Sequence, residues 1–106
     1  MNGDQKFLDI LEELKALHLK KAADYGSDDD PLQNIRGAAK CGIAPHHAAW
    51  VRALDKVHRI NRWYSKGSLA NESVEDSLMD LAAYAIIVLR LLREHERLVN
   101  ECGDPH

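Results

Sequence analysis

Apolar residues recur every three or four positions along most of the chain, whereas strict alternation of apolar and polar residues is almost absent. A period near 3.6 residues is typical of amphipathic helices, so the pattern predicts an all-α protein without strands. The apolar segments predict three long helices and one short helix. The approximate bounds are Asp4–Ala23, Pro31–Cys41 (the short helix) and His46–Ser65, followed by a last helix that continues to about Val99 and carries Glu72. At 106 residues the chain can bury one hydrophobic core. We therefore expect a single domain, residues 1–106, folded as a four-helix bundle with loose ends at 1–3 and 100–106.

Residues that favour helix ends lie between the predicted helices: Gly26, Gly42, Pro45, Gly67, and Asn71 or Ser73. Glycine adopts the left-handed conformation that ends many helices, and Asn or Ser before a helix accepts hydrogen bonds from first-turn amides. The last helix is therefore expected to begin with a cap at Asn71 or Ser73. Residues 27–31 hold three aspartates before a proline and predict a turn that caps the short helix.

The first two long helices each have an apolar side. In the first helix this side comprises Phe7, Ile10, Leu11, Leu14, Leu17 and His18. In the second it comprises Trp50, Ala53, Val57, Ile60 and Tyr64. A stripe of this kind is typical of the face by which a helix packs against its neighbours, and Trp50 indicates either core or a dimer surface.

The formal net charge is -3. A protein that binds nucleic acid or anionic membranes through charge alone needs a positive excess, so both are excluded as a general function. No apolar run is long enough to span a bilayer, and the first residues do not form a signal peptide. Cys41 and Cys102 lack the spacing of a zinc site or a disulfide framework. These features predict a cytoplasmic protein.

Three carboxylates, Glu72, Asp76 and Asp80, follow one another at four-residue spacing near the start of the last helix. This spacing places them on one face, and the apolar run that follows indicates that Asp80 is buried. A buried carboxylate must be paired, hydrogen-bonded or bound to a cation. Mg²⁺, which prefers oxygen ligands, is one candidate. The alternative is that the first two acids complement the positive end of the helix while Asp80 pairs with an arginine.

The second long helix has a mainly basic face formed by Arg52, Asp55, Arg59 and Arg62, with Lys56 at its edge. Cations on this face would either neutralise the carboxylates directly or leave room for a metal and a phosphate between the two helices. The alternative is a solvated face with ion pairs within the helix, such as Asp55 with Arg59.

A cation, a carboxylate and a phenol lie where the chain leaves the first helix, at Lys21, Asp24 and Tyr25, and Asn34 follows in the short helix. Junctions of this kind often form binding pockets. The alternative is a simple helix end in which Gly26 supplies the positive φ angle and the neighbouring side chains pack the turn.

Taken together, these segments resemble a family of small phage and bacterial proteins known as a nucleotide-modification-associated domain, which is similar to the MazG-like all-α nucleotide pyrophosphohydrolases. The resemblance covers about residues 20–92 and is carried by Lys21-x-x-Asp24-Tyr25-Gly26, Asn34, Arg52-x-x-Asp55-Lys56-x-x-Arg59-Ile60 and Glu72-Ser73-x-x-Asp76-x-x-x-Asp80-Leu81-Ala82-x-Tyr84-Ala85. It implies a helical bundle, usually a homodimer or homotetramer, that binds Mg²⁺ and splits a nucleoside triphosphate into monophosphate and pyrophosphate.

The resemblance also implies roles for individual residues. Asp55, Glu72 and Asp76 would be the metal ligands, while Asp80 and Lys56 would act in catalysis. The residues expected to bind the nucleotide are Lys21, Asp24, Tyr25, Asn34, Arg52 and Arg59. The chain departs from the family pattern at residues 12–16, where the usual EExxE motif lacks its final acid.

Three functions follow as alternatives. The first is an Mg²⁺-dependent pyrophosphohydrolase acting on an NTP or a dNTP, with the carboxylates holding the metal. The second is a protein that binds or sequesters nucleotide without turning it over. The third is a helical interaction module in which a buried salt-bridge network fixes how the helices pack. The network would consist of Asp55, Asp76, Asp80, Arg52 and Arg59.

Overall fold

The structure is a computed structural model that describes residues 2–25, 32–70 and 72–102. Its elements are α1 (Gln5–Tyr25), α2 (Gln33–Arg36), the 3₁₀ helix η1 (Gly37–Cys41), α3 (Pro45–Lys66) and α4 (Val74–Cys102). Within these ranges there is no strand, which confirms the all-α prediction and the three long helices. In the same ranges, no helix is both long enough and apolar enough to cross a bilayer.

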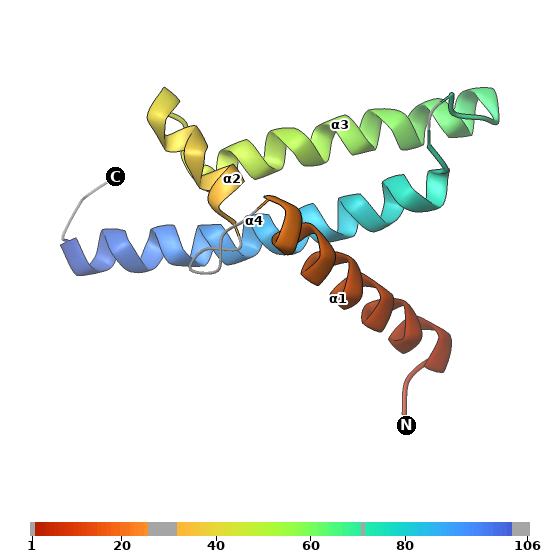
Figure 1. Cartoon of the computed structure of the whole chain (residues 1–106), viewed down its shortest axis with the longest axis horizontal. Helices are drawn as coiled ribbons and strands as arrows, with labels where there is room; N and C mark the ends of the chain where they lie inside the picture. Colours follow the sequence, from red (N-terminus) through yellow and green to blue (C-terminus); the bar gives the residue numbers. More distant parts are fainter. Residues whose placement is uncertain (1, 26–31, 71, 103–106) are drawn as a thin grey trace.

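Helices α3 and α4 run antiparallel and lie side by side, while α1 crosses α4 near its middle (Figure 1). The N-terminal half of α1 projects away from this hairpin (Figure 1). Helices α2 and η1 contact α3. Because α1 crosses the hairpin instead of lying along it, the regular MazG-like bundle stays a prediction.

The helix ends follow the residues that the sequence offers for them. Gly67 adopts a φ of 79° after α3, and its N–H donates to the Trp63 carbonyl at 2.7 Å. The Ser73 hydroxyl accepts from the Asp76 N–H at 3.1 Å, which confirms the cap predicted at this position. Asn71 and the turn predicted at 27–31 lie outside the described residues.

Two elements differ most from their predicted bounds. The short helix is α-helical only from Gln33 to Arg36 and continues as a 3₁₀ helix from Gly37, since glycine weakens an α-helix and short 3₁₀ turns often end one. At the other end, α4 continues three residues past Val99. An ion pair one turn apart, Arg97 to Glu101 at 3.2 Å, lies in this last part of the helix.

The core lies where α2, α3 and α4 meet. Its buried members are Ile35, Ala49 and Leu91, against which Leu32, Ala48, Tyr84, Ile87 and Val88 pack. Ala49 and Ala53 have no exposed surface, since small side chains on α3 allow a close approach to α4. Ile60 is buried, whereas Trp50 and Tyr64 on the same apolar side of α3 are 47% and 74% exposed. They lie at the margins of a stripe that a single neighbouring helix cannot cover.

The apolar side of α1 is covered over only part of its length. Leu14 is buried, but Phe7, Ile10 and Leu11 are 60%, 51% and 44% exposed. Only part of the stripe therefore packs within one chain. The physical reason is the crossing angle of α1, which brings only the later turns of the helix onto α4 (Figure 1).

Replacing Leu91 with alanine should lower the free energy of unfolding by about 2–5 kcal/mol, because a buried side chain leaves a cavity in the packed centre. Leu91 is only 2% exposed, whereas Leu89 on the same helix is 45% exposed. Urea unfolding of Leu91→Ala and the matched control Leu89→Ala tests this. Equal losses in the two variants would show that the core is not where α2, α3 and α4 meet.

Candidate functional site

Asp80 lies between two lysines that belong to different helices. Lys21 on α1 donates to Asp80 Oδ1 at 2.9 Å, and the Nζ of Lys56 on α3 lies 3.0 Å from Oδ2. The side chains of Asp80 and Lys56 are 12% and 14% exposed, so this pair is largely withdrawn from water. The positive partner that a buried Asp80 requires is therefore supplied by lysine.

Glu72 is the second carboxylate in this cluster, but it precedes α4, which begins at Val74. Its Oε1 accepts from Arg59 at 2.5 Å and from the hydroxyl of the fully buried Ser77 at 2.7 Å. Lys56 Nζ lies 3.8 Å from the same oxygen. Lys56 thus stands between Glu72 and Asp80, and a chain of charges connects all three long helices.

The pKa values of both carboxyl groups lie below their ordinary values. For Asp80, burial by itself would raise the pKa, but the hydrogen bonds from Lys21 and Lys56, together with their positive charges, outweigh it. For Glu72, the hydrogen bond from Arg59 lowers the pKa most, followed by the one from Ser77. Both groups are consequently ionised at neutral pH.

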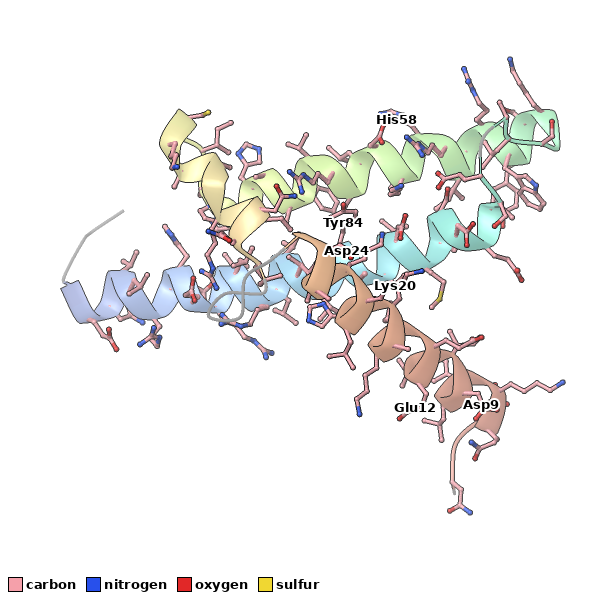
Figure 2. All side chains as sticks on the ribbon, viewed as in Figure 1. Asp9, Glu12, Lys20, Asp24, His58 and Tyr84 are labelled. Atoms are coloured by element: carbon pink, nitrogen blue, oxygen red, sulfur yellow. The ribbon has the colours of Figure 1, made fainter. Side chains whose placement is uncertain are left out.

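A cavity of about 240 Å³ opens beside Asp80, where α1, α2, α3 and α4 come together. It is lined by His18, Lys21, Ala22, Leu32, Asn34, Ile35, Arg52, Asp80, Ala83, Tyr84 and Ile87. Tyr84 lies between α3 and α4, close to the end of α1 (Figure 2). Four predicted site residues, Lys21, Asn34, Arg52 and Asp80, meet in this cavity although they are distant in the sequence.

Arg52 differs from the other cations near the cavity. Lys21 and Lys56 bind Asp80, and Arg59 binds Glu72. Among the residues that the structure describes, Arg52 makes no ion pair, and its side chain lines the cavity. A guanidinium in this position can bind a planar or tetrahedral anion through two N–H groups at once.

The remaining predicted nucleotide-binding residues lie elsewhere. Asp24 is exposed and does not line the cavity, and Arg59 is engaged with Glu72. Tyr25 ends α1, and its side chain lies outside the part that the structure describes. The junction at the end of α1 therefore contributes Lys21 to the cavity but not Asp24.

The three predicted metal ligands are not brought together. Asp55 is 62% exposed and pairs with Arg59 at 3.4 Å within α3, Asp76 is exposed, and Glu72 is bound by cations. Over residues 2–25, 32–70 and 72–102, no group of three histidine, cysteine or acidic residues could hold a metal ion. The prediction that Glu72, Asp76 and Asp80 lie in one line on the last helix is wrong for Glu72, because this residue precedes α4.

The buried salt-bridge network predicted for an interaction module is found only in part, and Arg59 and Asp55 in it are 45% and 62% exposed. Asp80, Arg59 and Asp55 take part in it, together with Lys21, Lys56 and Glu72. Arg52 and Asp76 make no ion pair in the described ranges. The network connects α1, α3 and α4, so it contributes to how the helices pack.

Two contributors were missed by reasoning from sequence. Ser77 is fully buried and binds Glu72, and Tyr84 lines the cavity. Both lie on the side of α4 that also carries Leu91, at spacings of seven residues. A polar residue spaced by two helical turns from an apolar residue that is expected to be buried is the signal that would have indicated Ser77 and Tyr84.

Compared with known proteins, the chain matches no family model, no curated protein and no solved structure. The cavity and the ion pairs around it therefore carry the functional inference.

The paired carboxylates should make stability depend on pH. A carboxyl group whose pKa is lower in the folded chain than in the unfolded chain stabilises the fold at pH values above its unfolded pKa, which is about 4. This contribution is lost as the pH falls through the pKa of the folded chain. The free energy of unfolding should therefore decrease below about pH 4. In the double variant Glu72→Gln/Asp80→Asn, urea unfolding should show a smaller dependence on pH in this range. An unchanged dependence would contradict the lowered pKa values of Glu72 and Asp80.

Removing Lys56 should destabilise the fold, because Asp80 would remain largely buried with Lys21 as its cationic partner. We expect Lys56→Met to lower the free energy of unfolding by about 1–3 kcal/mol at neutral pH. Lys40→Met, at an exposed position of η1, is the matched control and should change little. A recovery of stability in Lys56→Met/Asp80→Asn would show that the unpaired carboxylate is the cause.

Proposed function

We propose that this chain binds a nucleotide, an NTP or a dNTP, with phosphate oxygens at Arg52 and Lys21. The observation that carries the proposal is that Lys21, Asn34 and Arg52, from three separate helices, line one cavity. The same three residues are among those to which the family resemblance assigns nucleotide binding.

The side chains in the cavity suit the parts of a nucleotide. Arg52 offers a guanidinium that matches a phosphate in geometry, and Lys21 adds a compact positive charge. The Asn34 amide can donate and accept hydrogen bonds, as a base or a sugar requires. Asp80 would hold the Lys21 ammonium at the wall of the cavity, since Lys21 Nζ lies 2.9 Å from Asp80 Oδ1.

The pairing of the carboxylates favours binding without turnover. Glu72 and Asp80 are already bound by lysine and arginine, and the other two acids of the predicted set lie exposed. Mg²⁺ would have to displace Lys56 from between Glu72 and Asp80. Hydrolysis to monophosphate and pyrophosphate therefore stays a prediction, and sequestration of nucleotide is the function that this arrangement supports better.

Nucleotide should raise the thermal midpoint of the wild-type protein, because a ligand at about 100 times its Kd stabilises the folded state by about 2.7 kcal/mol. The midpoint is measured with each canonical NTP and dNTP, with and without Mg²⁺. Arg52→Met should weaken nucleotide binding by at least ~10-fold, since it removes a charge-assisted contact. Arg62→Met, which removes the same charge from an exposed position of α3, is the control.

The same samples separate the alternatives. Stabilisation without product supports a nucleotide-binding protein, whereas release of pyrophosphate and monophosphate with Mg²⁺ supports the pyrophosphohydrolase. No stabilisation by any nucleotide contradicts the proposal. Equal affinities of Arg52→Met and Arg62→Met would show that nucleotide binds outside this cavity.

A further inference from the structure

Two histidines from different helices face each other next to the core. The ring centroids of His46, in the first turn of α3, and His95, in the later part of α4, are 5.1 Å apart, and the ring planes are inclined by 69°. His46 lies three residues before Ala49 and His95 four residues after Leu91, so both continue the faces along which α3 and α4 pack. The antiparallel course of these helices brings the start of α3 against the later part of α4 (Figure 1). The packed centre therefore fixes the separation of the two rings.

The nitrogens of these two rings are not used elsewhere in the described part of the chain. Within residues 2–25, 32–70 and 72–102, neither imidazole takes part in a hydrogen bond or an ion pair. His46 is half-buried, whereas His95 is exposed and borders a surface hollow of about 340 Å³ that Glu96, Val99 and Asn100 also line. Both rings are consequently available to a ligand that arrives from solvent.

The separation of the rings matches that of two imidazoles bound to one metal ion. With metal–nitrogen bonds of about 2.0 Å and tetrahedral angles, the centres of two such rings lie about 5 Å apart. Each ring can turn about its Cβ–Cγ bond at small cost, because this torsion of histidine has a broad profile. Since the centre of the ring lies close to the axis of that bond, the turn redirects the nitrogens and leaves the separation of 5.1 Å nearly unchanged.

We propose that His46 and His95 bind a divalent transition-metal ion between α3 and α4. Imidazole nitrogen suits Zn²⁺, Ni²⁺ and Cu²⁺, whereas Mg²⁺ and Ca²⁺ prefer oxygen ligands. Over the ranges that the structure describes, no group of three histidine, cysteine or acidic side chains could hold a metal, so the pair supplies two ligands and water completes the coordination. The water ligands lie on the exposed side of His95, where a ligand from solution can replace them.

This site differs in place and in chemistry from the carboxylate cluster. Asp80 lies fifteen residues before His95 on α4, which is about 22 Å along the helix axis. The carboxylates of the cluster are hard oxygen donors already bound by lysine and arginine, whereas the two imidazoles are nitrogen donors without a cationic partner. The proposal does not depend on nucleotide binding, because it uses neither Lys21 nor Arg52.

Calorimetric titration of the full chain with Ni²⁺, in the absence of nucleotide and in a buffer that keeps imidazole neutral, tests the proposal. A single ion should bind per chain, with Cu²⁺ bound more tightly and Mn²⁺ more weakly. The thermal midpoint should rise with each ion that binds, since the two ligands are brought together only in the folded chain. Mg²⁺ at the same concentration should produce neither effect.

His46→Gln and His95→Gln should each weaken Ni²⁺ binding by at least ~10-fold, because each removes one of two nitrogen ligands. His47→Gln and His58→Gln are the matched controls and should bind Ni²⁺ as the wild type does. Both control positions are exposed, and Figure 2 shows His58 on the side of α3 away from α4. Circular dichroism and the thermal midpoint without metal verify that each variant is folded, and the two test variants change different helices, so either one suffices.

Three results would overturn the proposal. The first is a wild-type chain that does not bind Ni²⁺. The second is an unchanged Ni²⁺ affinity in His46→Gln or His95→Gln. The third is an equal loss of affinity in His47→Gln or His58→Gln, which would mean that the ion binds to exposed histidines without the pair between α3 and α4.

Discussion

A carboxylate removed from water must be matched by positive charge, and the arrangement of this protein depends on how Asp80 meets that requirement. Lys21 approaches it from α1 and Lys56 from α3, while Asp80 itself belongs to α4. These contacts connect three helices at one point. Because α1 contacts α4 only where the two cross, the Lys21–Asp80 pair has a large share in fixing where α1 lies. Buried ion pairs contribute little net stability, but a misplaced one is costly, so they favour one packing of the helices over others.

The same contact changes the charge of the neighbouring cavity. Two lysines neutralise Asp80, so the carboxylate does not repel an anion as strongly as a free one would. Arg52, which has no ion pair within the described part of the chain, is the cation best placed to bind a phosphate oxygen. Under the proposed nucleotide binding, different cations would serve folding and binding, Lys56 the first and Arg52 the second.

Sequence reasoning succeeded where local rules apply and failed where the answer lies between elements. The helices follow from the period of the apolar residues. The cap at Ser73 follows from the ability of its hydroxyl to accept a hydrogen bond from a first-turn amide. The low exposure of Asp80 follows from its apolar neighbours. Helical spacing, however, does not apply to Glu72, because this residue lies before α4, whereas Asp76 lies in the helix and is exposed. The identity of the partners of Asp80 and the crossing angle of α1 depend on tertiary contacts, which no period within a single helix encodes.

The attachment of α1 through its later turns has a consequence for the dynamics of the chain. Local opening free energies are lowest where few apolar groups are buried, so the amides at the start of α1 should exchange with solvent water before those of α3 and α4. Since α1 also supplies one wall of the cavity, a ligand that contacts both α1 and α4 would bind only while the later turns of α1 are closed. Such a ligand would slow amide exchange across that helix, and the binding equilibrium would be linked to the opening of a single element.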